Sequence, residues 1–244
     1  MYRYKCIISY DGYDYMGFQV QDDLNTIELE IEKALYNFIG QDIKIYPSGR
    51  TDRHVHAKGQ VIHFDLDKNI PANCIKSGLN SFLPPDIYVI SCEEVDLDFH
   101  ARFSAKSKEY RYYINRGEYD PFKARYSVNI KNLDLNLMRE AIKKFIGVHD
   151  FKGFASSSID KRKETQKDIY EAKIYVIGDY LEFIFIGSGF LKYQIRRMMG
   201  VLVEIGRGKE NIDFIDRVLE EKDPSISHRS LDGCGLYLYK VNYE

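Results

Sequence analysis

Apolar residues in the first hundred positions recur with the periods of strands and helices in turn. Residues 2–10 are rich in aromatic and β-branched side chains, which predicts a strand. Between 27 and 38 the apolar positions follow helical spacing, with the capping-box pair Asn25 and Glu28 at the start and Gly40 at the end. The same criteria predict strands over 43–46, 60–66 and 87–95 and a helix over 71–83.

The second half of the chain shows a similar pattern. Glycine at position 178, followed by aspartate, separates two strand-like runs and indicates a tight hairpin. Residues 190–205 are apolar nearly all round, which predicts a buried helix. The remaining predictions are strands over 109–115, 169–176, 180–185 and 235–243 and helices over 137–145 and 212–219.

Interspersed strands and helices with hairpin signals favour an α+β fold with largely antiparallel sheets over a doubly wound parallel fold. The seam between the halves is expected around 103–108. We therefore predict two similar α+β halves, 1–104 and 105–244, each with helices flanking its sheet.

Composition narrows the class of protein. With 244 residues, 44% of them hydrophobic, the chain can build a proper core, and it contains no run of eighteen apolar residues. No signal-peptide pattern precedes the first strand, so a soluble, cytoplasmic protein is expected. Four widely spaced cysteines form no C-x-x-C pair, which indicates reduced thiols.

The net charge of −2 conceals a separation of charge along the chain. Basic residues outnumber acidic ones over 102–116, 161–167 and 192–209. These segments would suit a cleft that grips a phosphate backbone, or they would form ordinary solvated faces.

The densest group of reactive side chains lies between Ser48 and Phe64. On an extended segment Arg50 and Asp52 point to the same side, and the guanidinium would lower the pKa of the Asp52 carboxyl. An ionised aspartate in a cleft acts as a nucleophile or a base. The alternative is an aspartate that hydrogen-bonds the backbone of a turn beside Gly49.

A metal site is a second interpretation of this stretch. Asp52, His54 and His56 alternate, so a strand would present all three on one face. No further histidine or cysteine pair with ligand spacing follows, and Arg53 and Lys58 would repel a cation. A metal-free site is therefore favoured.

An aromatic and basic run follows over 99–113 and includes Arg102 and Arg111. Stacking rings mixed with phosphate-binding charges suit unpaired or flipped RNA bases. The alternative is a strand whose tyrosines pack inside the protein. Arg196 and Arg197 interrupt the apolar run 190–205, and at least one of them is expected to meet a carboxylate or reach solvent.

Six motifs, in order over nearly the whole chain, resemble those of the TruA family of tRNA pseudouridine synthases. One of the two longest joins the G-R-T-D and V-H-A blocks around Asp52. The other is the F-H-A-R-F-S block that leads to Tyr110. The others are Y-D-G with G-F-Q from Tyr10, H-D-F from His149, G-F-L with Q-I-R from Gly189, and G-L-Y-L from Gly235.

This resemblance implies isomerisation of uridine to pseudouridine in RNA, most specifically in the tRNA anticodon stem-loop, by a homodimer with no metal and no organic cofactor. It places Asp52 on the family's nucleophile and Arg50 on the arginine that holds the flipped nucleotide. Tyr110 falls on the tyrosine that stacks on the base, Arg196 on the partner of the aspartate, and Leu236 on an apolar wall. Further RNA-binding candidates are Arg53, His54, His56, Arg102 and Arg111.

The chain departs from the family's motif directly after Asp52, where Arg53 and His54 replace a small residue and a glycine. Glycine at such a turn supplies a positive φ that histidine adopts less easily, so a strained or altered loop is expected. Three alternatives remain at this point: a paralogue acting on another structured RNA, a metal-dependent hydrolase, and an RNA-binding protein without catalysis.

Overall fold

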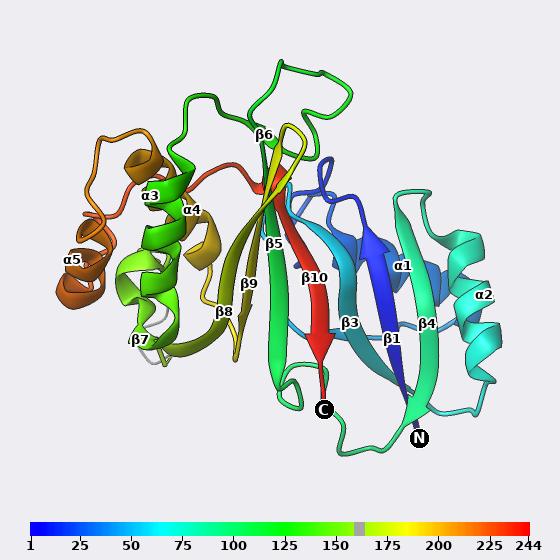
Figure 1. The fold of residues 1–244 in the computed structure, drawn as a ribbon. Coiled ribbons are helices and arrows are strands. Elements are labelled where there is room, and N and C mark those ends of the chain that lie inside the picture. The colour runs from blue at the N-terminus through cyan, green and yellow to red at the C-terminus, as the bar shows by residue number, and fades with distance from the viewer. Residues whose placement is uncertain (159–163) are drawn as a thin grey trace. The chain divides into compact units, whose positions relative to one another are not determined.

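The computed structural model describes residues 1–158 and 164–244 as two compact units, each a sheet flanked by helices (Figure 1). The first unit comprises 1–106 together with 237–244, and the second comprises 107–236. Of the halves 1–104 and 105–244 predicted from the sequence, the second includes residues 237–244, whereas in the structure these residues belong to the first unit. The closing strand joins the first unit because it pairs there with a strand from far earlier in the chain, a relationship that local periodicity does not encode.

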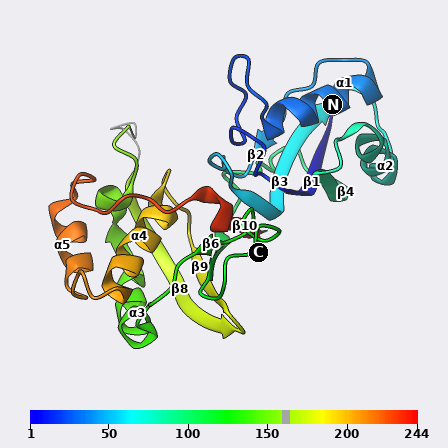
Figure 2. The ribbon, with the colours of Figure 1, turned by 90° about the horizontal axis from the view of Figure 1, so that it is seen from above.

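The sheet of the first unit has the strand order β4-β1-β3-β10, with β2 also paired to β3. Its pairs are antiparallel except for β10, which runs parallel to β3. Helices α1 and α2 lie on one face of this sheet (Figure 2). The elements are β1 (Tyr2–Tyr10), α1 (Ile27–Ile39), β2 (Tyr46–Pro47), β3 (His56–Leu66), α2 (Ala72–Phe82), β4 (Ile87–Val95) and β10 (Leu236–Asn242).

The core of the first unit is formed by apolar residues that recur with the strand period in β1 and with the helical period in α1. Alternate residues of β1, from Tyr4 to Tyr10, are buried, as the period of two requires of a half-buried strand. Ile27, Ile31 and Leu35 put the apolar stripe of α1 inward at helical spacing. The predicted strands 2–10 and 87–95 and the predicted helices are confirmed, whereas the strand expected over 43–46 shrinks to β2.

The predicted capping box of α1 is wrong. The N-cap is Thr26, not Asn25, and its side chain makes no capping hydrogen bond. The Glu28 carboxylate instead accepts a hydrogen bond from the Val20 N–H at 2.8 Å. The close of the helix agrees with the prediction, because Gly40 has a φ of 80° and its N–H bonds the Tyr36 carbonyl.

The second unit is built on the strand order β5-β9-β8-β7, with β6 parallel to β5. Its strands are β5 (Ser107–Asn115), β6 (Val128–Asn129), β7 (Gly147–Asp150), β8 (Gln166–Ile177) and β9 (Tyr180–Gly187). Its helices are α3 (Leu135–Ala141), α4 (Gln194–Gly206) and α5 (Phe214–Glu221), and the 3-10 segments are η1 (Ile142–Phe145), η2 (Phe151–Phe154) and η3 (Gly233–Gly235).

The predicted hairpin and buried helix are both present in the second unit. Gly178, with a φ of 58°, turns β8 into β9. Helix α4 begins at Gln194, four residues later than predicted, because Tyr193 before it has a φ of 67°. Strands as short as β6 and β7 leave no periodic signal and were not predicted.

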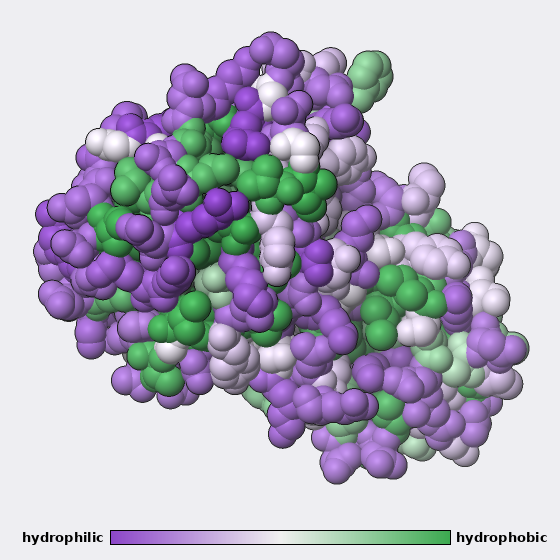
Figure 3. Space-filling model, in the orientation of Figure 1, coloured by the Kyte–Doolittle hydropathy of each residue, from purple (hydrophilic) through white to green (hydrophobic). Residues whose placement is uncertain are grey.

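Hydrophilic residues dominate the surface in Figure 3, with apolar groups scattered among them. In the described part of the chain no helix is long and apolar enough to cross a membrane. Residues 161–163 of the basic segment 161–167 lie outside the described residues.

Candidate active site

The loop from Ser48 to Val55, which we call the Asp52 loop, is tied at its base to β3 by Gln60. The Ser48 hydroxyl donates to Gln60 Oε1 at 2.7 Å, and Gln60 Nε2 donates to the Gly49 carbonyl at 2.7 Å. The Ser48 N–H also bonds the Val61 carbonyl at 2.7 Å. Gln60 is fully buried, so these bonds satisfy a polar side chain inside the core and fix where the loop leaves the sheet.

The residue before Asp52 is fixed from the opposite side. Thr51 Oγ1 lies 2.8 Å from the hydroxyl of Tyr10, and its carbonyl accepts the Phe18 N–H at 3.0 Å. Thr51 is buried, with only 7% of its surface exposed. The Y-D-G and G-F-Q blocks near the N-terminus therefore support the loop that carries Asp52.

Two glycines of these blocks allow the backbones to approach. A Cβ on Gly12 would lie 1.9 Å from the Val55 carbonyl oxygen, which no side chain tolerates. Gly17 has a φ of 100°, and a Cβ there would meet the Thr51 carbonyl oxygen at 3.0 Å. Glycine is thus required at both positions by contact with the Asp52 loop.

His56, the first residue of β3, supports the end of the loop. Its side chain is buried, and its ring stacks on Tyr237 with centroids 4.6 Å apart. Its Nδ1 lies 3.0 Å from the Asp11 carboxylate and 3.1 Å from the Gly12 nitrogen. The structure therefore uses His56, a predicted RNA-binding residue, to fix the turn after β1.

Asp52 directly follows Thr51, the last residue before it that these hydrogen bonds fix. Its carbonyl accepts the Val55 N–H at 3.2 Å in a tight turn, and its side chain is partly exposed. Arg50 is exposed and lines a surface groove together with residues of α1. A partly exposed carboxylate on a fixed loop, with a guanidinium two residues away, has the accessibility that a nucleophile needs.

His54 adopts a φ of 64°, the left-handed conformation that glycine favours. His54 thus adopts the conformation for which the family's motif has a glycine, and the backbone is strained there, as expected. The His54 ring stacks on Tyr13 with centroids 5.0 Å apart and planes 17° apart, and its Nε2 accepts a hydrogen bond from Arg53 at 2.9 Å. These contacts offset part of the strain.

The two histidines that suggested a metal site face different partners, His54 toward Tyr13 and His56 toward Asp11 and Tyr237. Over residues 1–158 and 164–244, no group of three or more histidine, cysteine, aspartate or glutamate side chains is arranged to hold a metal ion. The metal-dependent hydrolase is therefore not favoured.

The second unit contains the other residues that the resemblance singled out. Tyr110 lies on β5, 9% exposed, with its ring edge-to-face against Phe190 at 5.2 Å. Leu236, at the start of β10, is also buried. The Tyr110 ring thus packs against another aromatic ring, and little of the Leu236 side chain reaches solvent.

Arg196, on α4, is oriented by the segment before η3. Its Nε donates to the Leu231 carbonyl at 2.7 Å, and its own carbonyl accepts the Leu231 N–H at 3.0 Å. Its guanidinium lies 5.2 Å from the Tyr193 ring. Arg197 donates to the Pro224 carbonyl and the Ser227 hydroxyl, which are neutral oxygen atoms, and both arginines are partly exposed, as expected of at least one of them.

Two further candidates differ in their surroundings. Arg111 forms ion pairs with Glu109 at 2.7 Å and Glu182 at 2.8 Å, and Tyr113 also donates to Glu182. Arg102 is exposed, and its guanidinium lies 5.5 Å from the Phe103 ring. Arg111 thus has an intramolecular role, whereas Arg102 faces solvent.

Sequence reasoning missed the residues that hold the Asp52 loop, namely Tyr10, Thr51 and Gln60. A glutamine within an apolar strand is a usable signal, because a buried amide must find partners. The Tyr10–Thr51 contact left no signal, since 41 positions separate the two residues.

A family model described as "tRNA pseudouridine synthase" matches residues 6–104 and 141–244. The chain belongs to the tRNA pseudouridine synthase family. Within it, the chain is similar to proteins named tRNA pseudouridine synthase A. One from an Exiguobacterium species is 45% identical and covers all of this chain and 99% of its own length. Those from Oceanobacillus iheyensis and Streptococcus mutans are each 42% identical, cover all of this chain and span 98% and 100% of their own lengths.

Proposed function

We propose that this protein isomerises uridine to pseudouridine in the anticodon stem-loop of tRNA, with Asp52 as the nucleophile and without a cofactor. The observation that carries the proposal is the partly exposed Asp52 carboxylate on a loop that Tyr10, Thr51 and Gln60 fix. Membership of the tRNA pseudouridine synthase family supplies the reaction class.

The reaction conserves all heavy atoms. The bond from uracil N1 to ribose C1′ breaks, the base turns, and C5 bonds to C1′ in its place. The proton on C5 leaves to solvent and N1 gains one, so neither oxidant nor reductant is needed. Asp52 attacks the flipped nucleotide in its ionised form and is released when the new bond is complete.

Other residues act on the flipped nucleotide and on the nucleophile. Arg50 holds the flipped nucleotide, and Tyr110 stacks on the base. By the resemblance, Leu236 forms an apolar wall, and Arg196 is the partner of the catalytic aspartate. Ionisation of Asp52 and exclusion of water from the base follow from these roles.

The RNA is gripped beyond the reacting nucleotide as well. Arg53, His54 and Arg102 contact the substrate directly, whereas His56 and Arg111 position neighbouring groups through the contacts described above. The working form is a cytoplasmic homodimer on tRNA, as the resemblance implies.

Tritium release from tRNA labelled at uridine C5 tests the proposal, because the C5 proton leaves only when the C5–C1′ bond forms. Asp52→Asn keeps the size of the side chain and removes the charge, so release should fall below detection while the unfolding curve stays that of the wild type. Asp67→Asn, at an exposed aspartate of the same unit, is the matched control and should retain full release. Wild-type release by Asp52→Asn would contradict the assignment of the nucleophile.

The target position is tested separately. Chemical marking and sequencing of pseudouridines, in cells with and without this protein, should show loss of marks in the anticodon stem-loop of tRNA. Loss confined to another RNA would identify a paralogue with a different substrate, while leaving the reaction intact.

A further inference from the structure

Four aromatic rings form a continuous cluster on the first unit, which we call the ring cluster: Tyr46, His63, His100 and Phe103. The centroids of His63 and Tyr46 lie 5.0 Å apart, and those of His63 and His100 lie 4.6 Å apart. His100 and Phe103 are 4.4 Å apart. The cluster leads from the buried His63 outward to Phe103, which is 75% exposed.

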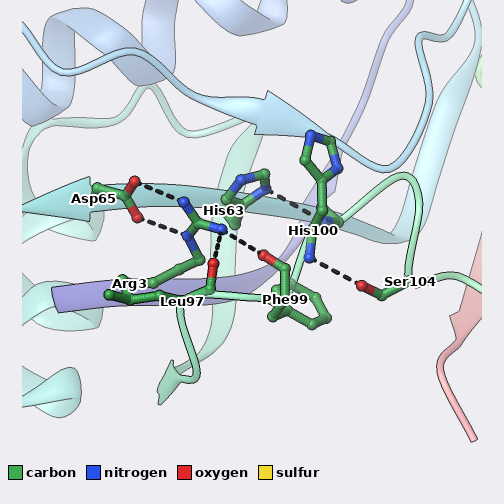
Figure 4. A network of polar contacts seen from close by, with 8 residues as sticks. Arg3, His63, Asp65, Leu97, Phe99, His100 and Ser104 are labelled. Atoms are coloured by element: carbon green, nitrogen blue, oxygen red, sulfur yellow. Dashed lines mark hydrogen bonds and ion pairs between the residues drawn. The ribbon is translucent and has the colours of Figure 1, made fainter.

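The turn that carries His100 and Phe103 is fixed by contacts from β1, from β3 and from the segment after β10. Arg3 of β1 donates to the carbonyls of Leu97 and Phe99 and forms a two-bond pair with Asp65 of β3 (Figure 4). The Ala101 N–H donates to His63 Nδ1 at 3.2 Å, and the Tyr243 hydroxyl of the segment after β10 donates to the Ala101 carbonyl at 2.7 Å. Phe103 therefore projects from a well-supported base.

The outer edge of the cluster combines flat apolar surface with positive charge. Phe103 and Tyr46, 42% exposed, leave ring area in water that folding could have buried. The exposed Arg102 guanidinium lies 5.5 Å from the Phe103 ring, and the Arg102 N–H bonds His100 Nδ1 at 3.1 Å. Such a combination of ring and guanidinium suits a base and its phosphate.

The histidine rings carry no charge at neutral pH. Burial, with His100 and Arg3 nearby, lowers the pKa of His63 to about 4. Burial and the charges of Arg3 and Arg102 lower the pKa of His100 as well. Both rings thus support the stack behind Phe103 as neutral aromatic groups.

We propose that the ring cluster is a second RNA-binding site, on which an unpaired base of the substrate stacks against Phe103 while Arg102 contacts the adjoining phosphate. This inference rests on the proposed function, since it deepens how the RNA substrate is held. An RNA base is favoured over an apolar protein partner because a guanidinium lies beside the exposed Phe103 ring and can bind the phosphate next to that base.

The ring cluster is made of residues that have no role in the proposed reaction. None of its four rings belongs to the Asp52 loop, and Phe103 lies on the segment between β4 and β5. Because the target base is assigned to Tyr110 in the proposed reaction, the base bound here is a different one, and it contributes to binding rather than to bond making.

Binding and turnover of tRNA by Phe103 variants test this site. In Phe103→Ala, both Kd and KM should rise about tenfold to a hundredfold, with kcat at saturating RNA unchanged, because stacking on one base is lost. Phe103→Trp keeps a flat ring and should bind as the wild type, whereas Phe103→Leu keeps apolar area without a ring and should bind like Phe103→Ala. Phe82→Ala removes another exposed phenylalanine of the same unit, 49% exposed, and should change nothing.

Unchanged Kd in Phe103→Ala would overturn the proposal, and so would wild-type binding by Phe103→Leu. Light scattering on the same variants provides a further test: loss of self-association in Phe103→Ala would show that the ring contacts a second copy of the chain instead of RNA. The two proposals fail differently. Tritium release with normal KM in Phe103→Ala would refute only the second site, and Phe103-dependent RNA binding without any release would refute only the isomerase.

Discussion

The hydroxyl of Tyr10 lies 2.8 Å from the hydroxyl of Thr51 in the interior of the first unit. This contact joins the end of β1 to the residue that precedes Asp52. Burial raises the pKa of Tyr10 to about 12, so its hydroxyl keeps its proton at neutral pH. The position of Asp52, the proposed nucleophile, thus depends on two residues that take no part in the proposed reaction.

Tyr10→Phe should lower both activity and stability. It leaves the buried Thr51 hydroxyl without this partner, which costs about 1 kcal/mol, and loosens the loop, so we expect kcat to fall about tenfold with little change in KM. Urea denaturation and tritium release measure the two effects. In a cycle with Thr51→Val, the double variant should be little worse than either single one. Fully additive effects would show that the two hydroxyls do not cooperate.

Gly12→Ala should be far more damaging than an ordinary glycine substitution. Its Cβ would lie 1.9 Å from the Val55 carbonyl oxygen, so the backbone of the Asp52 loop must move, at a cost of more than about 2 kcal/mol and with loss of tritium release. Gly40→Ala is the comparison, because its φ of 80° is unfavourable but no atom lies within 4 Å. Only about 1 kcal/mol is expected there. Equal losses of unfolding free energy in the two variants would contradict the close contact.

Two substitutions at His54 separate backbone strain from ring stacking. Both His54→Gly and His54→Ala remove the stack on Tyr13, but only glycine relieves the φ of 64°. His54→Gly should therefore be more stable than His54→Ala by about 1 kcal/mol in urea denaturation. If alanine were as stable as glycine, the positive φ at this position would not be costly.

His63 should make the stability of the first unit depend on pH. Its folded pKa of about 4 lies below the ordinary value of 6.5, so between these values the unfolded chain binds the proton more readily. Stability is therefore greatest above pH 6.5 and falls as the pH drops toward 4, by roughly 3 kcal/mol at most. His63→Gln keeps an acceptor for the Ala101 N–H without the titration, and its unfolding midpoint should change less between pH 7 and pH 4.5. The same pH dependence in both proteins would contradict this account.

The amino-acid sequence predicted those elements that have a strong period. β1 was predicted with its correct ends and α1 close to its observed bounds. Residues two apart share a face of a strand, and residues three or four apart share a face of a helix, so both patterns can be recognised without knowledge of the rest of the chain. The turn at Gly178 was equally local, since only one backbone conformation joins the two strands there. The order of the six motifs along the chain also identified the family.

Tertiary structure decided what depends on residues far apart in the chain. β10 joins the first unit because Tyr237 pairs with His56, and the His100 ring meets the His63 ring because the segment after β4 lies against β3. Such pairings span tens to hundreds of positions and have no period, so the sequence names the residues without placing them. Asp52 was recognisable from its motif alone, but its support by Tyr10 and Gln60 followed only from the packing of the folded unit.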